Sequence, residues 1–117
     1  MLLAIQTRQA EPDIDVVEVG GHLVMGQPCQ DLQWTIDDLL GKSKRKILLD
    51  VTKVTYSDSA GVGAIVSSCG RVKKAGGQIR VAGAAGKLAD LFKVTKVQRM
   101  IAIDPAVDDA LAKLRSA

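Results

Sequence analysis

The residues best suited to chemistry lie in the stretch 50–63, where Asp58 and Ser59 stand side by side. The stretch leaves an apolar run and enters a segment with helical spacing, so both residues fall where a helix cap is expected. A carboxylate or hydroxyl there accepts hydrogen bonds from free backbone N–H groups. Gly61 and Gly63 follow in the first turn, although glycine costs roughly 1 kcal/mol per helical position. They indicate that another backbone or a partner surface approaches closely.

The rest of the chain supplies little catalytic or metal-binding chemistry. His22 is the single histidine, and no Gly-x-Ser-x-Gly motif surrounds Ser59, so an enzyme with a serine nucleophile is the weaker rival hypothesis. We predict that His22 lies in a loop near a strand end. Cys29 and Cys69 have no CxxC spacing and are interpreted as reduced residues of two helices, with a disulfide as the open alternative. We therefore expect no catalytic residue, no metal site and no cofactor.

Composition and charge fit one domain over residues 1–117. The chain is 47% hydrophobic and 25% charged, and 16 Lys and Arg against 13 Asp and Glu give a net charge of +3. The basic tract 42–46 is typical of solvated charges, and the three aromatic residues are too few for a stacking platform, so no direct nucleic-acid partner is expected. No apolar stretch approaches the roughly 18 residues of a membrane span. With no signal-peptide pattern in residues 1–6, a cytoplasmic protein without a membrane partner is predicted.

Hydrophobic periodicity predicts alternating strands and helices along the chain. Gly20-Gly21 should interrupt the second strand, Gly41 should close the first helix in a left-handed conformation, and Asp104 should cap the last helix before Pro105. Strands are expected at 2–9, 14–19, 47–51, 78–82 and 100–103, and helices at 28–40, 60–74, 86–92 and from 104 onward. This order, β-β-α-β-α-β-α-β-α, predicts an α/β fold with a mixed, mostly parallel sheet covered by helices.

The stretch 50–63 resembles the signature of STAS domains, the module shared by bacterial anti-sigma-factor antagonists and sulphate transporters. The matching residues are Asp50, Val54, the run Asp58-Ser59-Ala60-Gly61-Val62-Gly63, Gly76-Gly77 and Leu91-Phe92. The predicted element order agrees with a STAS-like fold over nearly the whole chain. The resemblance implies an anti-sigma-factor antagonist, a non-catalytic protein-binding switch in a partner-switching pathway that regulates transcription.

The resemblance also implies which residues carry the switch. Ser59 corresponds to the serine that an anti-sigma factor with serine kinase activity phosphorylates, and a phosphatase restores the binding form. Partner contacts would come from two segments, the residues Asp58, Ser59, Ala60, Gly61, Val62 and Gly63 and the residues His22, Leu23 and Val24. The second segment reads Gly-His-Leu-Val where the family usually has Gly-Glu-Leu-Asp. This departure leaves a second hypothesis open, a STAS scaffold or nucleotide-binding module that is not phosphorylated.

Overall fold

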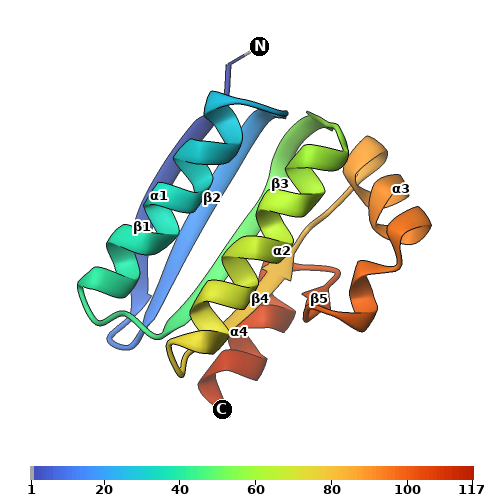
Figure 1. Ribbon diagram of the computed structural model, residues 1–117. Coiled ribbons are helices and arrows are strands. Elements are labelled where there is room, and N and C mark those ends of the chain that lie inside the picture. Colours follow the sequence, from blue (N-terminus) through green and yellow to red (C-terminus); the bar gives the residue numbers. More distant parts are fainter. Residues whose placement is uncertain (1) are drawn as a thin grey trace.

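The computed structural model describes residues 2–117, which form a mixed five-stranded sheet with helices on both faces (Figure 1). Strand β1 runs antiparallel to β2, and β2 to β5 are parallel, in the spatial order β1-β2-β3-β4-β5. The strands are β1 Ala4–Glu11, β2 Ile14–Leu23, β3 Lys46–Ser57, β4 Gln78–Ala82 and β5 Ile103–Asp104; the helices are α1 Gln27–Gly41, α2 Ser59–Lys74, α3 Gly86–Thr95 and α4 Val107–Arg115, with a 3-10 turn at Val97–Arg99. The predicted element order and fold class are confirmed.

The sheet buries an apolar layer on each face. Alternate residues of the parallel strands face opposite sides, as the period of a strand requires. On one face, Val17 and Leu49 belong to a large cluster with α1, α2 and α3. On the other, Val16 and Leu48 meet Ala110 and Leu114 of α4 in a smaller cluster. Figure 1 shows α1 and α2 in front of the sheet and α4 behind it. No helix within residues 2–117 is long and apolar enough to cross a membrane.

Two strands are longer than the pattern predicts. Strand β2 continues through Gly20-Gly21 to Leu23, because irregular register steps beside both glycines let the pairing with β3 resume. Gly21 has a φ of 88°, and a Cβ there would lie 2.2 Å from the carbonyl oxygen of Leu2. Strand β3 extends beyond Val51 to Ser57. His22 is therefore the second-last residue of β2, opposite Tyr56 of β3, and does not lie in a loop.

Three predicted helix ends differ from the structure. Helix α3 runs to Thr95 and not to Phe92. Gly41 is the last residue of α1, and the left-handed residue is Ser43, whose N–H bonds to the Leu40 carbonyl oxygen. Asp104 does not cap α4, since the N-cap is Ala106. Asp104 instead ends β5, which spans residues 103–104 and not 100–103. Its buried carboxylate pairs with two cations from neighbouring elements, and this pairing outweighs the local tendency of Asp-Pro to start a helix.

Candidate functional site

The turn from β3 into α2 is organised by Asp58. The residue has extended backbone angles and caps α2, as predicted, with its Oδ1 accepting a hydrogen bond from the Gly61 N–H at 2.9 Å. Helix α2 begins at the next residue, Ser59. The serine hydroxyl is therefore free of the capping role and stands in the first turn, where unpaired N–H groups make the helix end electropositive.

The second carboxylate oxygen of Asp58 joins two segments that are distant in the sequence. Oδ2 accepts a hydrogen bond from the Met25 N–H at 3.0 Å, across 33 residues. The contact is possible because β2 and β3 are parallel and end at the same edge, with Leu23 opposite Ser57. The Met25 N–H, and after it those of Gly61 and Ala60, hold the pKa of Asp58 below its ordinary value despite partial desolvation. Asp58 is therefore an anion at neutral pH.

Close packing beneath the turn explains Gly61. A Cβ at Gly61 would lie 2.2 Å from Ser57 Oγ and 2.3 Å from the Leu23 carbonyl oxygen, so only glycine fits. Ser57 is fully buried, and its hydroxyl donates to the same Leu23 carbonyl at 2.9 Å. The backbone that approaches Gly61 is thus the protein's own β2. At Gly63 a Cβ would meet nothing within 4 Å, and that residue is exposed.

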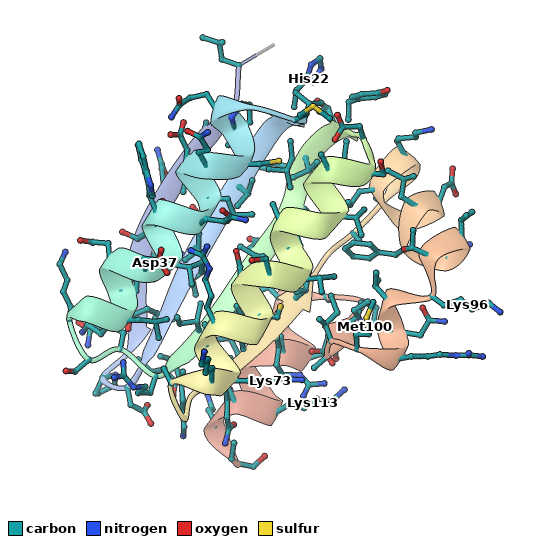
Figure 2. All side chains as sticks on the ribbon, in the orientation of Figure 1. His22, Asp37, Lys73, Lys96, Met100 and Lys113 are labelled. Carbon is teal, nitrogen blue, oxygen red and sulfur yellow. The ribbon has the colours of Figure 1, made fainter. Side chains whose placement is uncertain are left out.

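Ser59 lies on the outer surface of this turn, with two large apolar side chains displayed at the same edge. Met25 is 75% exposed and Tyr56 is 45% exposed. The Tyr56 ring stacks at a tilt against His22, with their centroids 5.6 Å apart. Figure 2 shows His22 at the end of the molecule where α1 and α2 begin. The end of the sheet therefore combines an exposed serine, an ionised aspartate and apolar surface.

The nine residues predicted to contact a partner separate into two groups. Leu23, Gly61 and Val62 are buried, and they shape the site from below. The other six are exposed or half-buried at the surface: His22, Val24, Asp58, Ser59, Ala60 and Gly63. The sequence predicted a partner surface at residues 57–63 and 21–27, which includes Met25 without singling it out and omits Tyr56. Tyr56 carried a usable signal, as one of three aromatic residues and one that stands two positions before Asp58.

The two cysteines are free thiols in α1 and α2, as predicted. Cys29 lies beside the site, where its Sγ donates to the Val24 carbonyl oxygen at 3.1 Å. Burial, reinforced by the nearby Asp58 charge, raises the pKa of Cys29, and burial raises that of Cys69 to about 12. Both thiols are therefore protonated at neutral pH and are weak nucleophiles. Within residues 2–117, no cluster of His, Cys, Asp and Glu side chains is arranged to hold a metal ion.

Comparison with known proteins identifies the family. The sequence profile of the STAS domain matches residues 8–110, and the chain belongs to the STAS domain family. A Thermotoga neapolitana protein named as an anti-sigma factor antagonist homologue is 26% identical over 83 residues, which cover 71% of this chain and 74% of that protein. A Thermotoga maritima protein with the corresponding name is 25% identical over the same shares of the two chains. The resemblance inferred from residues 50–63 is thus confirmed at the level of the family.

Solved structures share the fold. An anti-sigma factor antagonist from Mycobacterium paratuberculosis superposes with a TM-score of 0.83 at 18% identity, covering 97% of this chain and 95% of that one. SpoIIAA in its unphosphorylated form gives a TM-score of 0.74 at 16% identity, covering 97% and 100%. At these identities the likeness concerns the arrangement of strands and helices.

Proposed function

We propose that this protein is an anti-sigma-factor antagonist whose binding to an anti-sigma factor is controlled by phosphorylation of Ser59. The observation that supports this most directly is the contrast among neighbouring serines. Ser59 is exposed, whereas Ser57 and Ser68 are fully buried and Ser67 is half-buried. A kinase can reach the Ser59 hydroxyl without opening the fold, and the two relatives named as antagonists belong to the same regulatory class.

The surroundings of Ser59 suit a switch that acts through charge. A phosphoryl group adds about −1.5 to −2 charges at neutral pH. The start of α2 tolerates such a charge, since helix N-termini favour anions. The partner would cover the surface formed by Met25, Tyr56 and Val24. A phosphoryl group on Ser59 would then lose its water next to the ionised Asp58, which costs free energy and weakens binding. Phosphorylation would thus remove the partner and leave the fold intact.

The remaining parts of the proposal follow from that role. The partner is an anti-sigma factor with serine kinase activity, and a phosphatase returns Ser59 to its binding form. The protein has no catalytic role of its own, and it acts in the cytoplasm, where sigma factors act. The six exposed or half-buried residues among the predicted contacts, together with Met25 and Tyr56, would form the partner surface.

Phosphate mapping tests the assignment of Ser59. The protein is incubated with ATP and a serine kinase encoded beside its gene, and the modified residue is located by mass spectrometry. We expect phosphate on Ser59 and none on the buried Ser57 or Ser68, with Ser59→Ala abolishing incorporation. Phosphate chiefly on another serine would contradict the proposal. A partner that binds tightly while no serine is ever modified would favour the scaffold hypothesis instead.

A binding comparison tests the switch. Ser59→Asp should weaken binding to the anti-sigma factor about tenfold or more, equivalent to roughly 1.4 kcal/mol. Its free energy of unfolding should change by less than about 1 kcal/mol, because an acidic residue suits the first turn of a helix. Ser43→Asp is the matched control, since Ser43 is exposed at the other end of the sheet and Asp tolerates its φ of 64°. Calorimetry that finds equal affinities for the two variants would count against the switch.

A further inference from the structure

A second hollow surface lies at the end of the sheet opposite Ser59. It is formed by the turn between β1 and β2 and by the loop between α1 and β3, and its volume is about 350 Å³. The residues that line it are Pro12, Asp13, Lys42, Ser43, Lys44, Arg45 and Lys46. Four of these carry a positive charge and one carries a negative charge, which gives the lining a net charge of +3. The basic tract seen in the sequence is therefore folded around a concavity.

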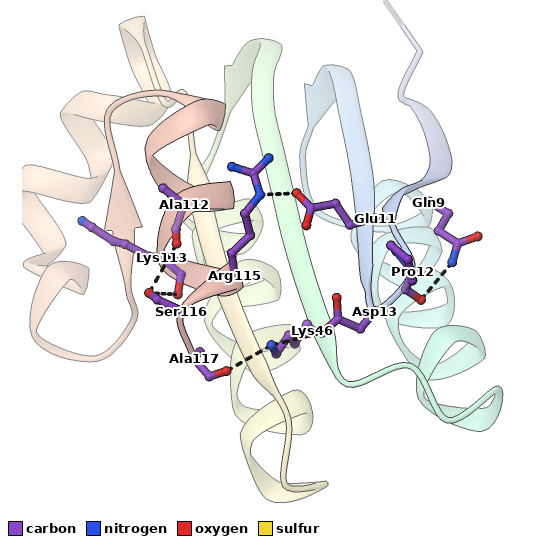
Figure 3. A network of polar contacts seen from close by, with 10 residues as sticks. All are labelled: Gln9, Glu11, Pro12, Asp13, Lys46, Ala112, Lys113, Arg115, Ser116 and Ala117. Atoms are coloured by element: carbon purple, nitrogen blue, oxygen red, sulfur yellow. Dashed lines mark hydrogen bonds and ion pairs between the residues drawn. The ribbon is translucent and has the colours of Figure 1, made fainter.

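The cations of this hollow are only partly neutralised. Arg45 meets no carboxylate within the described residues, because its Nη1 donates to the backbone oxygens of Leu40 and Lys44 at 3.0 and 2.9 Å. Its guanidinium is thereby held in place while its other N–H groups are left available. Lys46 pairs with Asp13 at 3.1 Å and donates to the Ala117 carbonyl oxygen at 3.1 Å (Figure 3).

The two remaining lysines have weak carboxylate contacts. Lys42 pairs with Asp38 at 3.0 Å on the solvent-exposed side of α1, where such a pair contributes little. Lys44 lies 3.9 Å from Asp15, at the limit of an ion pair. Cations near a helix C-terminus also interact favourably with the helix dipole, and this accounts for Lys42 and Lys44 individually. It does not account for Arg45 and Lys46, which lie beyond the helix and line the same hollow.

A neighbouring hollow adds further cations. It has a volume of about 250 Å³ and is lined by Lys73, Arg80 and Lys113, and the carboxylate of Asp104 neutralises part of the charge of Arg80 and Lys113. Figure 2 shows Lys73 and Lys113 at the end of the molecule opposite His22. Lys46 and Ala117 join the two hollows, because Lys46 lines the first, Ala117 lines the second, and the two are hydrogen-bonded. Concave surfaces of one sign concentrate ions of the other.

We propose that the hollow formed by Pro12, Asp13 and the tract 42–46 binds a small ligand that carries two linked phosphoryl groups. Six of the seven lining residues carry a charged or hydroxyl group, so the hollow offers several groups that can bind an anion. A diphosphate carries about three negative charges spread over two phosphoryl groups, so it can contact Arg45 and the weakly paired Lys42 and Lys44 together, whereas a single carboxylate can contact fewer of these cations. Arginine and lysine are the side chains that most often bind phosphate oxygens. This ligand would bind independently of the anti-sigma factor, at the far end of the sheet.

Calorimetric titration with inorganic pyrophosphate, at about 0.1 M salt to limit long-range attraction, tests the site. Lys42→Gln/Lys44→Gln should weaken binding about tenfold or more. The control Lys74→Gln/Lys87→Gln removes the same charge from two exposed lysines outside the hollow and should change affinity less than about twofold. Equal losses in the two double variants would overturn the proposal, because they would reflect net charge alone. Thermal melts verify that each variant is folded.

A substitution that strengthens binding makes the test independent of damage to the fold. Among the described residues, Asp13 is the one acidic side chain that lines the hollow. Asp13→Asn removes this charge and releases Lys46, so we expect affinity for pyrophosphate to rise about threefold or more. Asp90→Asn, which neutralises an exposed aspartate of α3, should leave affinity nearly unchanged. No gain in Asp13→Asn would count against the site. Binding to vesicles of phosphatidylglycerol and phosphatidylcholine, without binding to free pyrophosphate, would also overturn it in favour of a lipid surface.

Discussion

On one face of the sheet, α1, α2 and α3 bury a broad layer of aliphatic side chains, whereas on the other α4 alone covers a patch of six buried residues. Ionic contacts supplement that smaller patch. Asp104 binds both Arg80 and Lys113 with its buried carboxylate, and Arg115 pairs with Glu11 of β1 (Figure 3). The first face therefore relies mainly on close apolar packing, whereas the second combines a smaller apolar patch with buried ionic contacts. The two faces should therefore respond to different substitutions and to different solution conditions.

The largest effect is expected from a change of shape on the first face. In Gly61→Val, the Cβ would lie only 2.2 Å from Ser57 Oγ and 2.3 Å from the Leu23 carbonyl oxygen. The two methyl groups of valine add further bulk. Because neither backbone nor buried hydroxyl can move aside, we expect the free energy of unfolding to fall by about 3 kcal/mol or more. Urea denaturation measures this loss.

Gly63→Ala is the matched control for that experiment. A Cβ at Gly63 meets nothing within 4 Å, and the residue is helical, so alanine should raise stability by up to about 1 kcal/mol. If the two variants behaved alike, the steric account of the turn would be wrong. Because Gly61→Val is expected to destabilise the fold, it is unsuited to mapping a partner surface. Exposed positions such as Gly63 are suited to it.

A smaller effect, with a clear pH dependence, is expected from the α4 face. Burial alone would raise the pKa of Asp104, but hydrogen bonds and charge from Arg80 and Lys113 outweigh it and hold that pKa below the ordinary value of 3.8. We expect Asp104→Asn to lower the free energy of unfolding by about 2 kcal/mol, since both cations keep partial contact with water.

The sign of the pH dependence follows from the depressed pKa. The contribution of Asp104 is fully present above the unfolded value, about pH 4, and is lost as the pH falls through the lower folded value. Melting curves of wild type and Asp104→Asn should therefore converge in acid. A gap that persisted there would assign the loss to packing. Asp108→Asn, at the exposed first turn of α4, should cost less than about 1 kcal/mol at neutral pH.

The smallest effect concerns a polar group within the apolar face. Ser68 is fully buried in α2, and its Oγ has no hydrogen-bond partner among the described residues. Ser68→Ala removes this unsatisfied hydroxyl and adds helix propensity, so we expect a gain of about 1 kcal/mol. Ser67→Ala, at the half-buried neighbouring position, should change stability by less than about 0.5 kcal/mol. A loss of stability in Ser68→Ala would mean that the hydroxyl is satisfied in solution.

Local patterns predicted the elements and the centre of the site. The helical spacing of 60–74 and the Asp-Ser pair before it were sufficient to place the cap at Asp58. Contacts between distant residues were not predictable in the same way. The hydrogen bond from the Met25 N–H to Asp58 spans 33 residues in the sequence. The residues next to Gly61 in the sequence likewise do not predict that the Leu23 carbonyl will lie against it.

Two of the errors have different physical causes. Asp104-Pro105 has the local chemistry of a helix start. However, the Asp104 carboxylate accepts a hydrogen bond from Arg80 of β4, 24 residues earlier in the sequence. Strand β3 continues past Val51, where β2 extends alongside it. Thr52, Val54, Thr55 and Tyr56 are strand-forming residue types, so this extension was readable from the sequence and was missed. A tertiary partner overrode local preference only at Asp104. The assignment of Ser59 as a phosphorylation site remains a prediction that the kinase experiment can decide.

The strand order β1-β2-β3-β4-β5 is also the order in which a ribosome delivers the strands. The two-residue turn between β1 and β2 allows the first hairpin to form early. Each later strand then joins the free edge of those already paired, and no pair has to separate to admit a newcomer. The helix that covers the second face, α4, emerges after all five strands. We therefore expect the turn between β3 and α2, which carries Ser59, to form during synthesis before α4 emerges. A nascent chain would then expose Ser59 while the second face of the sheet is still uncovered.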